Sequence, residues 1–202
     1  MSRTKKRLLR RVGIFGGSFD PPHVCHVFAC AFALLSDEID EVWVVPSYRH
    51  PFGKAMAPFR DRIRMVRLAM RPLGARVKVS TTEKDNEGPG YTYETLHRLR
   101  HAHPGCRFRL IVGSDILHER RRWHRFADVQ RLAPLLIVPR DGRGARASGF
   151  ALPDVSSTRL RHLLGRRASP GAMLPASVLR YVCENDLYLS ATRGRMHSGP
   201  CR

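Results

Sequence analysis

The stretch RVGIFGGSFDPPHVCH, residues 11–26, carries the strongest structural signal in this chain of 202 residues. Residues 11–15 are typical of a buried strand that the glycine pair ends, and residues 26–35 have the composition of an apolar helix. A strand, a turn and a helix in this order begin a crossover unit of a parallel sheet. Ligands of such sheets bind outside the carboxyl ends of the strands, so we expect the site at this loop.

The remainder of the chain alternates between apolar runs and helical patterns. Strands are predicted over residues 41–45, 76–80, 107–112 and 135–138. Helices are predicted from Pro58 onward and over residues 91–103, 156–164 and 175–185. Strands separated by helices favour parallel pairing, so the predicted fold class is α/β. We expect residues 11–189 to form one domain, residues 1–10 a disordered basic arm and residues 190–202 a disordered tail.

Charge is the property in which the composition departs from the globular average. The chain has 36 Lys and Arg against 17 Asp and Glu, a formal net charge of +19. A surface of this kind attracts polyanions, which keeps a nucleic-acid-binding protein as one alternative. In the helix after Pro58, four arginines fall opposite the apolar face (Arg60, Arg64, Arg67 and Arg71). They form either a polyanion track or, as we favour, a solvated face.

No targeting or membrane segment is evident in the sequence. The N-terminal stretch lacks the apolar core of a signal peptide, and no window approaches the ~18 apolar residues of a spanning helix. The five cysteines are scattered and lack CxxC spacing, as expected of reduced thiols. We therefore expect a cytoplasmic protein without a membrane partner. A homo-oligomer is consistent with the sequence.

The loop itself has the residues of an anion site. Gly16 and Gly17 can let the backbone approach a ligand closely and adopt positive φ. His23 and His26 lie three residues apart, so on the first turn of a helix they share one face. Their N–H groups, together with the free backbone N–H groups of a helix N-terminus, suit a phosphate. Two other interpretations stay open, a zinc pair, for which no third ligand stands at a typical spacing, and two structural histidines.

Five motifs in the same order resemble one family. Residues 16–26, GGSFDPPHVCH, resemble the HxGH signature of the nucleotidyltransferase superfamily, and GGSFDPPH is similar to the form found in bacterial nicotinate-nucleotide adenylyltransferases. GYTYETL at 90–96 resembles SYTxDTL, GSD at 113–115 with Trp123 resembles G(A/S)D…W, and VSSTRLR at 155–161 resembles ISSTxxR. Residues 175–188 resemble the closing PxxVxxYI…LY. The resemblance implies a Rossmann-like parallel sheet with helices on both faces and a small C-terminal helical region.

The resemblance also implies an activity. Members transfer the adenylyl group of ATP to nicotinate mononucleotide, which gives deamido-NAD and pyrophosphate, with Mg²⁺ held mainly by the ATP phosphates and no metal site of the protein's own. ATP and nicotinate mononucleotide are then the expected partners, and no nucleic acid is expected. The mononucleotide phosphate is already an anion at pH 7, so the reaction needs no general base. Rival substrates are nicotinamide mononucleotide and phosphopantetheine, and a fragment of an aminoacyl-tRNA synthetase is a further alternative.

Site residues carry over from the matched motifs. The catalytic residues implied are His23, His26, Lys54 and Arg161. ATP binding is implied for Gly16, Gly17, Ser18, Phe19, His23, His26, Gly113, Asp115, Ser156, Ser157, Thr158 and Arg161. Mononucleotide binding is implied for Ser18, Lys54, Thr92 and Trp123, with Trp123 stacked on the pyridine ring. Each match has a plainer alternative, namely a capped surface helix at 156–161, a turn at Asp115 and a Trp123 packed on its own helix.

Three positions depart from the family pattern. Cys25 stands at the glycine of HxGH, and we expect the small thiol to be tolerated. The usual PPHK-like segment reads YRHPFGK at 48–54, from which Lys54 is carried over as a phosphate contact with His50 as its substitute. Glu94 stands where the family has Asp.

Overall fold

A parallel sheet of five strands forms the centre of the fold. The computed structural model describes residues 9–36, 38–49, 55–85, 90–115, 123–140 and 152–189. The strands are β1 (Arg10–Gly17), β2 (Glu41–Pro46), β3 (Val77–Val79), β4 (Cys106–Gly113) and β5 (Leu135–Val138). They pair in the order β3-β2-β1-β4-β5, all in parallel. The order in which strands are added to the sheet therefore reverses between β1 and β4, and parallel sheets bind ligands at such a position.

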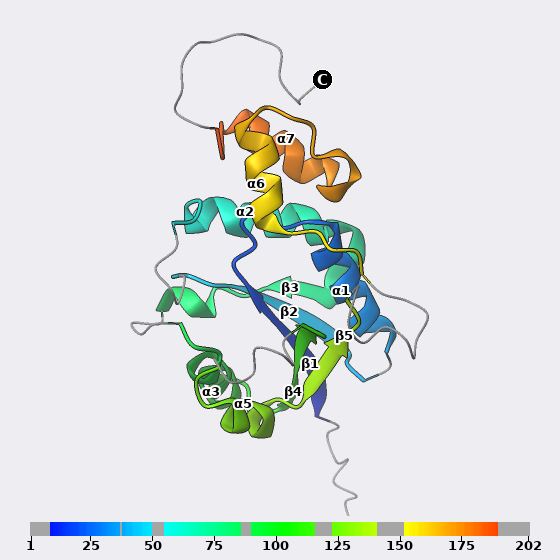
Figure 1. Ribbon diagram of the computed structural model, residues 1–202. Coiled ribbons are helices and arrows are strands. Elements are labelled where there is room, and N and C mark those ends of the chain that lie inside the picture. Colours follow the sequence, from blue (N-terminus) through cyan, green and yellow to red (C-terminus); the bar gives the residue numbers. More distant parts are fainter. Residues whose placement is uncertain are drawn as a thin grey trace, which may run out of the picture.

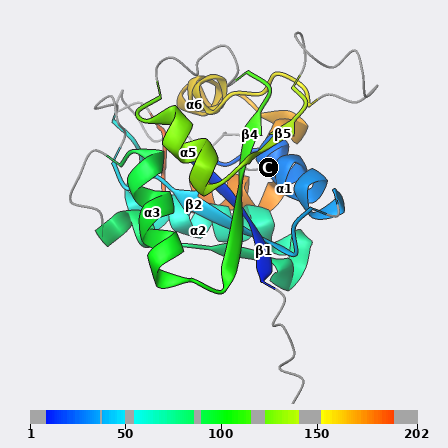
Figure 2. The ribbon, with the colours of Figure 1, turned by 90° about the horizontal axis from the view of Figure 1, so that it is seen from below.

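Helices cover both faces of this sheet, as predicted (Figure 1). The helices α1 (Val24–Leu35) and α2 (Phe59–Met70) lie on one face, and α3 (Thr92–Ala102) and α5 (Phe126–Leu132) on the other, nearer the viewer in Figure 2. The C-terminal helices α6 (Ser157–Gly165) and α7 (Ala176–Glu184) extend the first layer. Three 3-10 turns complete the described elements, η1 (Arg71–Arg76), η2 (Thr82–Asp85) and η5 (Gly171–Met173). The seven-residue α5 was not predicted, because it is too short to show a helical period.

Alternate residues of β2 enter two separate cores. In β2, Val42 and Val44 pack under α1 and α2, whereas Trp43 and Val45 pack under α3 and α5. All six residues of β2 are buried, which matches the continuous apolar run of a strand covered on both faces. In β1, a Cβ on Gly13 would lie 2.7 Å from the terminal methyl groups of both Ile39 and Ile111, so a larger residue there would force these side chains to move.

The arginines of α2 and its C-terminal end differ in their exposure to solvent. Arg60, Arg64 and Arg67 on α2, and Arg71 directly after it, are all exposed, which confirms a solvated face. Arg62 is only 1% exposed, and its guanidinium donates to the carbonyl oxygens of Ser18 at 2.9 Å and Ser47 at 2.7 Å. It also donates to the carbonyl oxygen of Ala57 at 3.0 Å. Arg62 thereby connects the loop after β1 to the loop after β2.

Several predictions about the chain as a whole have mixed outcomes. β1 begins at Arg10, one residue inside the predicted arm, and the remaining arm up to residue 8 and the tail from residue 190 lie outside the described residues. Cys25, Cys30 and Cys106 are free thiols, but Cys183 is disulfide-bonded, so the prediction of reduced thiols is wrong for Cys183. Among the described residues, none of the helices has the length and hydropathy needed to cross a bilayer.

Replacement of Arg62 by alanine should lower the free energy of unfolding by about 3 kcal/mol, because buried carbonyl groups lose their donor. Arg64→Ala, on the exposed side of the same helix, is the control and should change it by less than about 0.5 kcal/mol. Urea unfolding followed by circular dichroism measures both values. Equal, small effects of the two substitutions would contradict the role given to Arg62.

Candidate active site

A cavity of about 360 Å³ opens at the carboxyl ends of β1, β4 and β5. Its wall includes residues from the strand ends, from the first turns of α1 and α3, and from the segment before α5. Eight of the residues expected from the sequence line it, namely Gly16, Gly17, His23, His26, Thr92, Gly113, Asp115 and Trp123. Segments far apart in the sequence therefore meet beside the loop after β1, where the sequence predicted a site.

The two histidines form a fixed pair at the start of α1. His23 is the N-cap residue, and its backbone N–H donates to Nδ1 of His26 at 3.0 Å. The two rings stack with centroids 3.7 Å apart. Because Nδ1 of His26 accepts a hydrogen bond, the neutral ring carries its proton on Nε2. His26 therefore offers one N–H donor in a set orientation at the cavity wall.

Both imidazoles are held in the neutral form near pH 7. Burial lowers the pKa of His23 to about 4, and the positive charge of Arg140 acts in the same direction. Burial also holds the pKa of His26 well below its usual value, with His23 and Arg140 adding to the effect. Nδ1 of His23 has no hydrogen-bond partner within the described part of the chain. Such a pair suits a phosphate as a neutral donor set.

A zinc pair is not supported by this arrangement. In the ranges that the structure describes, no third His, Cys, Asp or Glu joins the two histidines in a group that could hold a metal ion. The partner of His26 Nδ1 is a backbone N–H, which occupies the lone pair that a metal would need.

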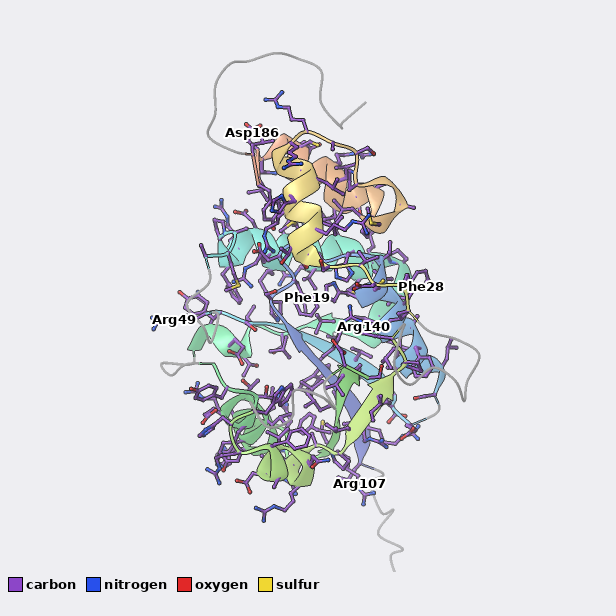
Figure 3. The ribbon with its side chains drawn as sticks, in the orientation of Figure 1. Phe19, Phe28, Arg49, Arg107, Arg140 and Asp186 are labelled. Atoms are coloured by element: carbon purple, nitrogen blue, oxygen red, sulfur yellow. The ribbon has the colours of Figure 1, made fainter. Side chains whose placement is uncertain are left out.

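Arg140 is a site residue that the sequence interpretation missed. It lies two residues after the end of β5 and is labelled in Figure 3. It lines the cavity and donates to the carboxylate of Asp115 at 3.1 Å. This pair lies across Gly113, where a Cβ would come within 2.5 Å of the Arg140 side chain. The available signal was its position, since the residues just after a parallel strand lie at the same edge of the sheet as the loop after β1.

The two glycines at the end of β1 differ in conformation from the expectation. Gly16 and Gly17 end β1 and do not adopt positive φ, whereas Phe19 does, at +49°. A Cβ on Gly16 would meet no atom within 4 Å, so this glycine leaves open space beside the backbone. Phe19 is buried, its ring edge-on to His26 at 4.9 Å between centroids, and Figure 3 labels it. Phe19 thus packs against the ring of His26.

The first turn of α6 is tied to the same loop. Arg161 donates to the backbone oxygen of Asp20 at 2.6 Å, and the hydroxyl of Ser157 donates to that of Pro21 at 2.9 Å. Ser156 caps the helix by accepting from the backbone N–H of Arg159 at 3.2 Å. Arg161 also donates to Thr158 Oγ1 at 3.2 Å. Within the described residues, the cavity wall does not include five of the residues expected to bind ATP, namely Ser18, Ser156, Ser157, Thr158 and Arg161. Their contacts with ATP stay predictions.

The cavity wall also includes the residues expected to meet the mononucleotide, Thr92 and Trp123. Thr92 begins α3, and Trp123 packs edge-on against Phe126 with centroids 6.0 Å apart. Tyr91 stacks on His124 at 4.6 Å, which links the start of α3 to the segment that carries Trp123. Trp123 is half-buried, so part of its ring is available to a ligand.

The departures from the family pattern are placed as follows. Cys25 lines the cavity, and its thiol donates to the backbone oxygen of Pro153 at 3.4 Å. Burial raises the pKa of this thiol, so it stays protonated near pH 7. Glu94 lies in the first turn of α3, 3.8 Å from His124. Lys54 and His50 lie outside the described residues.

The lowered pKa of His23 makes stability depend on pH. The unfolded chain binds a proton near pH 6.5, but folded His23 does so only near pH 4, so stability falls as the pH drops between these values. His23→Gln removes this titration and should flatten the dependence of the free energy of unfolding in that window. Urea unfolding measured across it tests this, and an unchanged slope in the variant would contradict the neutral assignment.

Known proteins resemble this chain along most of its length. The cytidylyltransferase-like family model matches residues 14–163. A probable nicotinate-nucleotide adenylyltransferase of Anaeromyxobacter dehalogenans (strain 2CP-1) is 44% identical over 182 residues, which cover 89% of this chain and 97% of the relative. The nicotinate-nucleotide adenylyltransferase of Bacillus subtilis is 30% identical over 191 residues, covering 90% of this chain and all of the relative.

Solved structures agree in fold. The Plasmodium falciparum nicotinic acid mononucleotide adenylyltransferase complexed with NaAD superimposes with a TM-score of 0.74 at 20% identity, covering 89% of this chain and 97% of that one. The parallel sheet, the histidine pair at the loop after β1 and the relatives at 30–44% identity agree with one another. The chain belongs to the cytidylyltransferase-like family and, within it, to the nicotinate-nucleotide adenylyltransferases.

Proposed function

We propose that this protein transfers the adenylyl group of ATP to nicotinate mononucleotide, with deamido-NAD and pyrophosphate as products. One observation carries the proposal. A neutral, stacked histidine pair and a half-buried tryptophan line a single cavity in a chain whose relatives bear the name of this activity. A cavity wall with hydrogen-bond donors for phosphate and an aromatic surface for a base suits two nucleotides that meet through their phosphates.

The reaction forms one bond and breaks one. An oxygen of the mononucleotide 5′-phosphate bonds to the α-phosphorus of ATP, and the bond from that phosphorus to the bridging oxygen of pyrophosphate breaks. The attacking phosphate carries about −1.5 to −2 charge at pH 7, so it needs no base. Catalysis then consists of aligning two polyanions and stabilising charge on the transferred and leaving phosphates.

In this proposal, the histidine pair binds the α- and β-phosphates. Nε2–H of His26 is the oriented donor, and His23 supplies a second. Because both rings are neutral, they act through directed hydrogen bonds instead of net charge. Arg140 provides a permanent positive charge on the same wall, and we assign it to the phosphates beside Asp115. We assign Arg161, Ser157 and Thr158 to the β- and γ-phosphates of ATP. We assign Lys54 to the region where the phosphates of the two substrates meet.

In this proposal, Mg²⁺ binds together with ATP and not at a site formed by the protein alone. The donors around the histidine pair are imidazole and guanidinium N–H groups, which suit phosphate oxygens and do not suit a cation. The proposed metal is therefore part of the Mg–ATP complex, held by phosphate oxygens and water.

His26→Ala should lower kcat by about 10²- to 10³-fold, since one oriented donor to the reacting phosphate is lost. The control is His101→Ala, an exposed histidine in the last turn of α3, which should leave kcat unchanged. Steady-state release of pyrophosphate measures both. Near-normal turnover in His26→Ala would refute the assignment of His26.

The substrate pair is tested by pyrophosphate release from ATP with each mononucleotide in turn. We expect a higher kcat/KM with nicotinate mononucleotide than with nicotinamide mononucleotide, and no release with phosphopantetheine. Release with phosphopantetheine alone would move the chain to a different substrate class, and no release with any acceptor would reject the enzymatic proposal.

A further inference from the structure

The turn after α7 brings a tyrosine back to the loop after β1. Tyr188 lies 168 positions after Asp20 in the sequence, and its hydroxyl donates to Oδ1 of the Asp20 carboxylate at 2.8 Å. Asp20 is only 1% exposed, so this hydrogen bond reaches a charge that water does not solvate. The last described residues of the chain therefore contact the loop that carries His23 and His26.

The backbone of this turn is shaped for that contact. Asp186, labelled in Figure 3, has φ of +50°, and Tyr188 has φ of +66°. One residue with positive φ commonly ends a helix, and Asp186 does so directly after Asn185, the C-cap residue of α7. Tyr188 has no such part in ending the helix. A non-glycine residue adopts positive φ at a cost in free energy, and the hydrogen bond to Asp20 offsets that cost.

A short, stiff segment connects Asp20 to the histidine pair. Only Pro21 and Pro22 separate Asp20 from His23, and each proline ring fixes its own φ. His23 is the N-cap residue of α1, and its backbone N–H donates to Nδ1 of His26 at 3.0 Å. A shift of Asp20 is therefore passed to His23 and, through this hydrogen bond, to the ring of His26.

The same carboxylate also pairs with Arg161. Oδ2 of Asp20 lies 3.4 Å from the Arg161 guanidinium, while Oδ1 accepts from Tyr188 and from the backbone N–H of Ala57. Without the Tyr188 hydroxyl, Asp20 loses one of its donors, and more of its charge has to be balanced by Arg161. Arg161 is then held more firmly by the protein and binds phosphate less readily.

We propose that Tyr188 is a positioning residue of the active site, which acts through the carboxylate of Asp20 on the histidine pair and on Arg161. This inference rests on the proposed function and assigns Tyr188 to the ATP half of the site. Thr92 and Trp123, the residues expected at the mononucleotide, come from α3 and the segment before α5, on the other face of the sheet.

Tyr188→Phe removes only the hydroxyl and keeps the ring. We expect kcat to fall about tenfold, because a small displacement of the donors to the reacting phosphate is costly. KM for ATP should rise about threefold as Arg161 is drawn to Asp20. KM for nicotinate mononucleotide should stay unchanged. Steady-state pyrophosphate release, with each substrate varied in turn, measures all three values.

Tyr181→Phe is the matched control. The Tyr181 hydroxyl also donates to a buried carboxylate at 2.8 Å, that of Asp61, but Asp61 lies in the first turn of α2 and not in the loop after β1. Urea unfolding should show similar losses of stability in the two variants, whereas only Tyr188→Phe should alter the kinetics. Equal kinetic effects of the two substitutions, no effect of either, or an equal rise in KM for the mononucleotide overturns the proposal.

A double substitution tests the route through Asp20. If Tyr188 acts through this carboxylate, Tyr188→Phe combined with Asp20→Asn should lose no more activity than Asp20→Asn alone. Losses that multiply would show that Tyr188 acts by another route, which overturns the proposal. If Asp20→Asn fails to fold, the comparison of the two tyrosine variants decides.

An NMR measurement without substrate separates this inference from the proposed function. The backbone amide of His23 donates to His26, so its ¹H–¹⁵N signal reports the geometry of the histidine pair. This signal should move in Tyr188→Phe and stay in place in Tyr181→Phe. An unmoved signal in Tyr188→Phe overturns the proposal. If the unaltered protein uses neither mononucleotide, the proposed function has failed, and the spectrum still decides whether Tyr188 positions the histidines.

Discussion

The buried carboxylate of Asp20 is the constraint on which the geometry of the site depends. Asp20 is 1% exposed, and its Oδ1 accepts from the backbone N–H of Ala57 at 3.1 Å and from the hydroxyl of Tyr188 at 2.8 Å. Its Oδ2 lies 3.4 Å from the guanidinium of Arg161. A buried charge is tolerated only when it is paired, so the loop after β1 cannot move without losing three distant partners. Burial and the Asp20 charge together raise the pKa of Tyr188, which keeps its proton in place.

Arg62 holds the same loop from the opposite side. Its guanidinium binds the carbonyl oxygens of Ser18 and Ser47, while Asp20 binds the segment before α2 through Ala57. His23 lies three residues after Asp20, and His26 lies six residues after it. The donors of the histidine pair are consequently oriented before any ligand arrives, which is the condition under which hydrogen bonds stabilise developing charge most effectively.

The large positive charge of the chain has little to do with the interior of the site. In the cavity wall as far as the structure describes it, Arg140 is the one permanent cation, and two carboxyl groups, Asp115 and Glu83, lie in the same wall. The arginines of α2, apart from Arg62, are exposed to solvent. A net charge of +19 on such a surface raises the rate of encounter with anionic substrates, while recognition depends on directed hydrogen bonds.

The sequence by itself determined the strands, the longer helices, the parallel class of the sheet and the loop with His23 and His26, because hydrophobic period and turn residues are local properties. Only the tertiary structure decided which charged residues are buried. Arg62 and Arg64 are two residues apart, yet the first is enclosed because its helical position, three residues after Phe59, faces the sheet. Arg140 and Glu83 enter the cavity because parallel pairing brings separate strand ends to one edge, and the partner of each side chain there comes from a distant part of the chain.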